Sequence, residues 1–72
     1  MPDSQPSLRQ RLANNVRDLR QERGWSQEDL AAQTQMHHTQ ISKIERSLHS
    51  VGINIIEKLA AAFEVPAARL LE

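Results

Sequence analysis

The chain has 72 residues and no cysteine, which limits how it can be stabilised. A chain this short buries only about 60% of the surface that its unfolded form exposes, and domains of this size often depend on disulfides or on zinc held by cysteines. Neither is available here, so the fold must rest on its apolar core, helped at most by a partner subunit. The composition, 39% apolar and 25% charged, is that of an ordinary globular domain. We therefore expect one small domain.

Apolar runs in the sequence are short. The longest, residues 59–63, is far below the roughly 20 residues that a membrane span requires. The amino terminus lacks the basic-then-apolar pattern of a secretory signal. The sequence thus predicts a cytoplasmic protein without membrane contact.

Helix is favoured over strand along the whole chain. β-branched residues never alternate with polar ones over a strand-like stretch, and only one Trp and one Phe occur. Residues 1–6 contain two prolines and no apolar periodicity, so we interpret them as a disordered leader and 7–72 as the single domain. Five short helices are expected, beginning near Ser7, Ser26, His37 or His38, Ile53 and just after Pro66.

Polar residues mark the predicted helix boundaries. Ser7 and Gln10 have the spacing of a capping box, and Ser26 repeats the start signal with Asp29 three residues later. Gly24 is expected to end the first helix, and residues 34–36 to connect the second helix with the third.

Apolar residues at helical spacing define the candidate core of an all-α, compact five-helix bundle. The expected core residues are Leu12, Val16, Leu19, Leu30, Met36, Ile41, Ile44, Ile53, Ile56, Leu59, Phe63 and Leu70.

Residues 26–46 carry the functional signal. They predict two short helices joined by a tight turn, each with one apolar face, which is the helix-turn-helix arrangement. Around it the sequence resembles the Cro/repressor, or XRE-like, family of DNA-binding domains. The matching pieces are Arg17-x-x-Arg20-x-x-x-Gly24-x-Ser26-Gln27-Glu28-x-Leu30-Ala31, Ile41-Ser42-x-Ile44-Glu45-Arg46 and Leu59-Ala60-x-x-Phe63-x-Val65.

The resemblance covers about residues 8–71 and implies a lambda-repressor-like fold and binding of double-stranded DNA. Within the family, the small controllers of restriction–modification systems look closest. The sequence departs from the family at three positions: Gln35 and Ser47 stand where Gly is usual, and Gly52 where a Ser is usual. The first two need a left-handed backbone, which costs a residue other than Gly about 1 kcal/mol, and Gly52 makes a weak cap.

The predicted third helix supplies the candidate base contacts. With Ile41 and Ile44 assigned inward, its outer side carries polar side chains that can read base edges in the major groove. The alternative is a solvated polar face. The candidates are His38, Thr39, Gln40 and Lys43.

Candidate phosphate contacts surround that helix. Gln27 opens the second helix, where free backbone N–H groups suit a phosphate, and the family resemblance implies that Gln27 clamps the DNA backbone. For each basic residue the alternative is a solvated surface charge. The further phosphate candidates are Arg17, Ser42, Lys43, Arg46 and His37.

Charge and histidine distribution fit this assignment. Nine basic residues balance nine acidic ones, but residues 37–52 hold Lys43 and Arg46 against one acid, together with all three His. Protonated histidines there would add positive charge toward phosphates. Neighbouring His37 and His38 point about 100° apart on a helix and, with His49, make a poor ligand set, so we expect no metal and no cofactor.

The family pattern also implies a structural contact. It pairs Arg20 with Glu45 across the domain as a partly buried ion pair, which fixes geometry more reliably than it adds stability.

Four apolar residues are not needed by the expected core and form a candidate homodimer patch. A dimer would place two recognition helices on half-sites about 10 bp apart in a palindromic operator. The alternative is that some of these residues cap the core. They are Leu48, Val51, Ile55 and Leu71.

The sequence thus predicts a sequence-specific transcription regulator that binds operator DNA as a homodimer, without a small-molecule effector. The alternative is an antitoxin-like or other protein-binding module on the same fold. An enzyme is not expected, because no nucleophile with a base, Gly-rich phosphate loop or paired-carboxylate pocket is visible.

Overall fold

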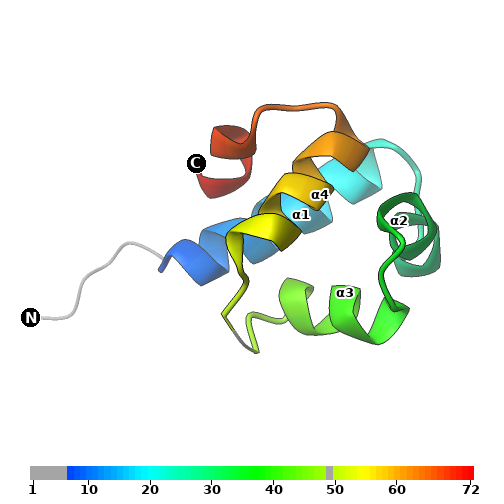
Figure 1. The fold of residues 1–72 in the computed structure, drawn as a ribbon, viewed down its shortest axis with the longest axis horizontal. Helices are drawn as coiled ribbons and strands as arrows, with labels where there is room; N and C mark the ends of the chain where they lie inside the picture. The colour runs from blue at the N-terminus through cyan, green and yellow to red at the C-terminus, as the bar shows by residue number, and fades with distance from the viewer. Residues whose placement is uncertain (1–6, 49) are drawn as a thin grey trace, which may run out of the picture.

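The computed structural model describes residues 7–48 and 50–72, which contain helices and no strand. The predictions for the leader 1–6 and for His49 lie outside these residues. Four α-helices are followed by a 3-10 helix (Figure 1). In chain order they are α1 (Leu8–Glu22), α2 (Gln27–Thr34), α3 (His38–Glu45), α4 (Ile53–Phe63) and η1 (Ala67–Leu71). The all-helical class is confirmed, with the fifth helix a 3-10 turn.

The long helix α1 lies between two groups of elements. α3 packs on one side of α1, while η1 packs on the other beside α4, and α2 contacts both α3 and α4 (Figure 1). α3 therefore lies at an edge of the molecule, with its inner face against α1 and α2. The buried core joins all five elements through Leu12, Val16, Leu19, Leu30, Ala31, Ile41, Ile44, Leu59, Ala60, Phe63 and Leu70.

Side chains cap the helix starts as predicted for α1 and α2. Ser7 Oγ accepts from Gln10 N at 3.2 Å while Ser7 N donates to Gln10 Oε1 at 3.0 Å. Ser26 and Asp29 form the same reciprocal pair, at 3.0 Å and 2.8 Å. At α4, Gly52 gives no side-chain cap, as expected. Each filled cap satisfies backbone N–H groups that the helix itself leaves unpaired.

All four α-helices end with the same backbone device. One residue just beyond the helix adopts a left-handed conformation, and the next residue donates its N–H to a carbonyl five positions back, which is the Schellman arrangement. The left-handed residues are Gly24 (φ 68°) and Gln35, Ser47 and Glu64 (each φ 58°). The closing bonds are Trp25 N to Arg20 O, Met36 N to Ala31 O, Leu48 N to Lys43 O and Val65 N to Ala60 O, at 3.0–3.1 Å.

Two details of the sequence prediction are wrong. Ile53, expected in the core, is 74% exposed, because helical side chains lean toward the amino end and those of the first turn project beyond the packed body. Thr34, expected in a connection, is the buried last residue of α2. Its hydroxyl donates to Leu30 O at 2.8 Å, one turn back, which satisfies it inside the helix. Met36 and Ile56 of the expected core are only partly buried.

Candidate nucleic-acid interface

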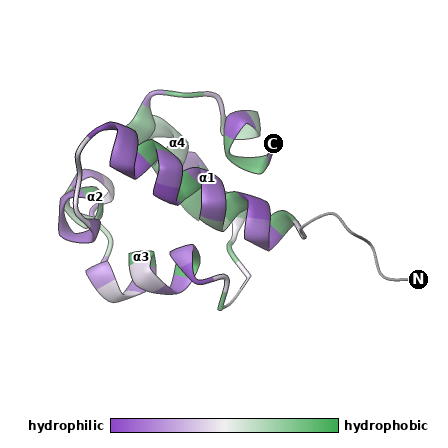
Figure 2. Ribbon diagram, turned by 180° about the vertical axis from the view of Figure 1, so that it is seen from behind, coloured by the Kyte–Doolittle hydropathy of each residue, from purple (hydrophilic) through white to green (hydrophobic). Residues whose placement is uncertain are grey.

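The outer side of α3 is polar and open. His38, Thr39 and Lys43 are exposed and Gln40 is half-buried, whereas Ile41 and Ile44 are buried. In Figure 2, α3 and the carboxyl-terminal turn lie on opposite sides of α1, and no other described helix covers the outer side of α3. The structure thus places all four candidate base contacts on a helix that a duplex can approach.

A histidine side chain caps the amino end of α3. His37 is the N-cap: its Nδ1 accepts the Thr39 backbone N–H at 3.2 Å. Its ring stacks on that of His38, with centroids 4.8 Å apart and an angle of 26° between the planes. Sequence reasoning placed His37 at phosphate and missed this cap. The cap requires an unprotonated Nδ1, so a charged His37 cannot make it.

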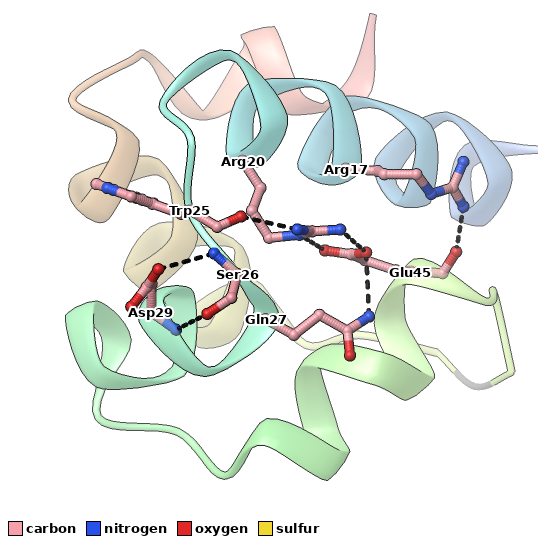
Figure 3. A network of polar contacts seen from close by, with 7 residues as sticks. All are labelled: Arg17, Arg20, Trp25, Ser26, Gln27, Asp29 and Glu45. Carbon is pink, nitrogen blue, oxygen red and sulfur yellow. Dashed lines mark hydrogen bonds and ion pairs between the residues drawn. The ribbon is translucent and has the colours of Figure 1, made fainter.

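Glu45, at the end of α3, is the centre of a polar network that joins three helices (Figure 3). Its carboxylate accepts from Arg20 Nε at 2.7 Å and from Arg20 Nη2 at 3.0 Å, and Gln27 Nε2 donates to Oε1 at 3.3 Å. Arg20 Nη1 also donates to Trp25 O at 2.8 Å. Gln27, the predicted phosphate clamp, is thus tied through its amide nitrogen to the ion pair.

The ion pair is well shielded from solvent. The side chains of Arg20 and Glu45 are 14% and 4% exposed. Hydrogen bonding to Glu45 raises the pKa of Arg20, and the carboxylate charge adds to this, against the opposing effect of desolvation. Because the pKa of Arg20 is raised, the protonated side chain contributes its full stabilisation at every pH below the ordinary pKa of arginine. This contribution is lost only when the pH rises above that value. Arg20 is therefore positively charged throughout the neutral pH range.

Arg17 reaches the same residue from one turn earlier on α1. Its Nη2 donates to the backbone carbonyl of Glu45 at 2.6 Å (Figure 3). Its Nη1 lies 3.5 Å from Asn14 Oδ1. Sequence reasoning placed Arg17 at phosphate. The observed contact is 28 residues away along the chain, and no local pattern in the sequence indicates it.

The remaining phosphate candidates border these contacts. Arg46 is exposed immediately after α3, and Ser42 is half-buried. An open polar groove runs between α1 and the end of α3, lined by Gln10, Ala13, Asn14, Arg17, Glu45, Arg46 and Ser47.

The candidate dimer residues divide into two groups. Leu48 is 56% exposed, whereas Val51, Ile55 and Leu71 are half-buried and pack against the core. Leu8 and Ile53, which were not predicted for this patch, are among the most exposed large apolar residues described. A shallow apolar hollow nearby is lined by Leu8, Arg9, Leu12, Val51, Ile56 and Leu71.

Within residues 7–48 and 50–72, no three His, Cys, Asp or Glu side chains are grouped so that they could hold a metal ion. None of the described helices is long and apolar enough to cross a membrane.

A short helix with a polar outer face, joined by a tight turn to a preceding helix and fixed at its far end, defines the helix-turn-helix class of DNA-binding domain. The chain belongs to the HTH_3 helix-turn-helix family, whose model matches residues 16–70. It is therefore a member of a family of DNA-binding transcription regulators of the XRE type, and its relatives are regulators and not enzymes.

One known protein and two solved structures show which members of the family this chain is similar to. A hypothetical transcription factor of Neisseria meningitidis serogroup B is 45% identical over 71 residues, 99% of this chain. This chain spans 66% of the length of that protein. A crystal structure of the hypothetical transcription factor NHTF from Neisseria matches with a TM-score of 0.89 at 41% identity, covering 100% of this chain and 86% of that one. The restriction–modification controller C.AhdI from Aeromonas hydrophila matches with a TM-score of 0.82 at 29% identity, covering 86% and 94%.

Proposed function

We propose that the protein is a sequence-specific transcription regulator that inserts α3 into the major groove of an operator. The observation that carries this is α3 itself: its outer side exposes His38, Thr39 and Lys43, while Glu45 at its end is held by Arg17, Arg20 and Gln27. Base readout needs side chains that are exposed and a helix that is fixed. This arrangement supplies both. The similarity to transcription regulators supports the same function.

The contacts follow from chemistry. Gln40 can pair with adenine through its amide, Lys43 can donate to guanine O6 and N7, and the methyl group of Thr39 can contact thymine. Arg46 and the backbone N–H groups in the first turn of α2 supply the candidate phosphate contacts.

The regulator acts as a homodimer on a palindromic site. One domain of this size makes too few phosphate contacts for tight and specific binding, and two-fold pairing doubles them. Leu8 lines the apolar hollow, and Leu48 and Ile53 are further exposed apolar side chains that are costly to leave in water.

The test is selection of binding sites from a random duplex pool, followed by titration of the recovered duplex at several salt concentrations. We expect an inverted repeat with half-sites about 10 bp apart, and an affinity that falls steeply with salt. Selection with a Gln40→Ala variant should yield the same inverted repeat without a base preference at one position of each half-site. Gln33→Ala, at an exposed position of α2 beside α4, is the matched control and should recover the wild-type site. No enrichment by the wild-type protein would contradict the proposal and favour a protein-binding module on the same fold.

A further inference from the structure

We infer that Arg17 is a positioning residue for DNA recognition: it sets the orientation of α3 through the Glu45 main chain and does not bind phosphate. This inference rests on the proposed function and removes Arg17 from the candidate phosphate contacts that the sequence indicated. It starts from the 2.6 Å bond between Arg17 Nη2 and Glu45 O.

Backbone bonds alone leave the carboxyl end of α3 incomplete. A helix leaves its last four carbonyls without partners inside the helix, and the segment after α3 donates to three of them. Arg46 N reaches Ser42 O, Leu48 N reaches Lys43 O and Ser47 N reaches Ile44 O, each at 3.1 Å. The last carbonyl, that of Glu45, receives Arg17. The guanidinium therefore completes the end of the recognition helix from a different element.

The charge of Arg17 suits this place. The carboxyl end of a helix carries partial negative charge, so a cation there is favourable, most of all when partly shielded from water. Arg17 is half-buried, and its second nitrogen faces Asn14 Oδ1 on the same helix at 3.5 Å. The guanidinium thus has a partner at each of its two terminal nitrogens. A phosphate that drew this guanidinium outward would have to break its bond with the Glu45 carbonyl.

Arg17 and Arg20 together make a two-point attachment. They stand three residues apart, on one face of α1, and both contact Glu45. Arg20 holds its carboxylate and Arg17 holds its carbonyl. With Ile41 and Ile44 already buried in the core, these two contacts restrain the carboxyl end of α3 more tightly than Arg20 alone would. Base readout tolerates errors of only about 0.5 Å in side-chain position, so the second point matters for discrimination between sequences.

A positioning residue and a phosphate contact differ in what their loss changes. A lost phosphate contact weakens binding to every duplex about equally and lowers the slope of log affinity against log salt by about 0.9 for each site lost. A lost positioning contact weakens the specific complex alone, because binding to random DNA does not depend on the alignment of α3 with base edges.

The experiment compares Arg17→Gln with Arg46→Gln, an exposed arginine at the same end of α3. Each variant is titrated with the duplex recovered by selection and with a random-sequence duplex of equal length, at several salt concentrations. We expect Arg17→Gln to lower the affinity ratio of the two duplexes by about tenfold with an unchanged salt slope. Arg46→Gln should weaken both complexes alike and lower the slope.

Equal weakening of both complexes by Arg17→Gln with a reduced slope, or no change in the ratio, would overturn the inference. A wild-type protein that does not discriminate between the duplexes would instead overturn the proposed function. Hydrogen exchange of the free protein adds a test without DNA: Arg17→Gln should speed exchange in the last turn of α3 more than in α1. Unchanged exchange there would also count against the inference.

Discussion

At the scale of single residues, the Arg20–Glu45 ion pair is one of the contacts that hold α3 against α1. A buried ion pair adds little net stability compared with apolar side chains of the same size, because desolvating two charges offsets most of their attraction. Breaking it is different, since the remaining charge stays buried without its partner. Glu45 is 4% exposed and its carboxylate receives two bonds from Arg20, so this site should show the asymmetry strongly.

We predict that Arg20→Met lowers the free energy of unfolding by about 3 kcal/mol or more, and that adding Glu45→Leu recovers a large part of the loss. Urea unfolding followed by circular dichroism measures both values. Lys58→Met, at an exposed position of α4, is the control and should change stability by less than about 0.5 kcal/mol. A double variant that is as unstable as the single one would contradict this account.

At the scale of elements, the helix ends are strained in a way that can be tested. Three of the four Schellman ends use a residue other than Gly in the left-handed conformation. Among these three, Gln35 lies within the helix-turn-helix and is exposed. The Cβ atom costs about 1–2 kcal/mol in that conformation, while Gly loses about 0.5–1 kcal/mol more backbone entropy on folding than Ala does.

We therefore predict that Gln35→Gly raises the free energy of unfolding by about 0.5–1 kcal/mol. Thermal unfolding of the two proteins gives the comparison. The matched control is Gln33→Gly, two residues earlier at an exposed position within α2, which should lower stability by about 1 kcal/mol because a helix interior disfavours Gly. If both substitutions destabilise, strain at Gln35 is not the reason that the family favours Gly there.

What the sequence could predict at this scale follows from distance along the chain. The boxes Ser7–Gln10 and Ser26–Asp29 were predictable, because each depends on residues three positions apart. The left-handed Gln35 and Ser47 were predictable from the family resemblance. The exposure of Ile53 was not, because periodicity does not show where the neighbouring helices end.

The site shows the same division. The four base-contact candidates followed from the periodicity of α3, which assigns Ile41 and Ile44 inward. The bonds from Arg17 to the Glu45 carbonyl and from Gln27 to its carboxylate join residues 28 and 18 positions apart. These two bonds depend on how the helices pack. An arginine or a glutamine in the sequence does not by itself show which residue it will contact. The His37 cap was missed because imidazole is an unusual acceptor at a helix start.

At the scale of the whole molecule, a net charge of zero makes the arrangement of charges decisive. Glu45 is the acidic residue nearest the end of α3, and Arg20 neutralises it. Arg17, Lys43 and Arg46 therefore give this end of the domain a positive character that the overall balance conceals. The attraction of one such patch to DNA is modest, and its effect grows when a second copy adds an identical patch one helical turn away.

The dimer can be tested at a residue that the monomer fold does not need. Ile53 is 74% exposed, so Ile53→Glu places a charge on the proposed dimer surface without disturbing the core. We predict that the wild-type protein sediments as a dimer at micromolar concentration and the variant as a monomer. Because a monomer loses the second set of phosphate contacts, its salt slope should fall by about half and its affinity for the selected duplex by about 100-fold.

Ala61→Glu provides the matched control, since it introduces the same side chain at an exposed position of α4 beside α2. It should leave sedimentation, salt slope and affinity at wild-type values. If Ile53→Glu remains a dimer, the interface lies elsewhere on the surface. If the wild-type protein is itself a monomer and still selects an inverted repeat, two copies meet only on DNA, and cooperative binding to the two half-sites then has to supply the affinity that a preformed dimer would give.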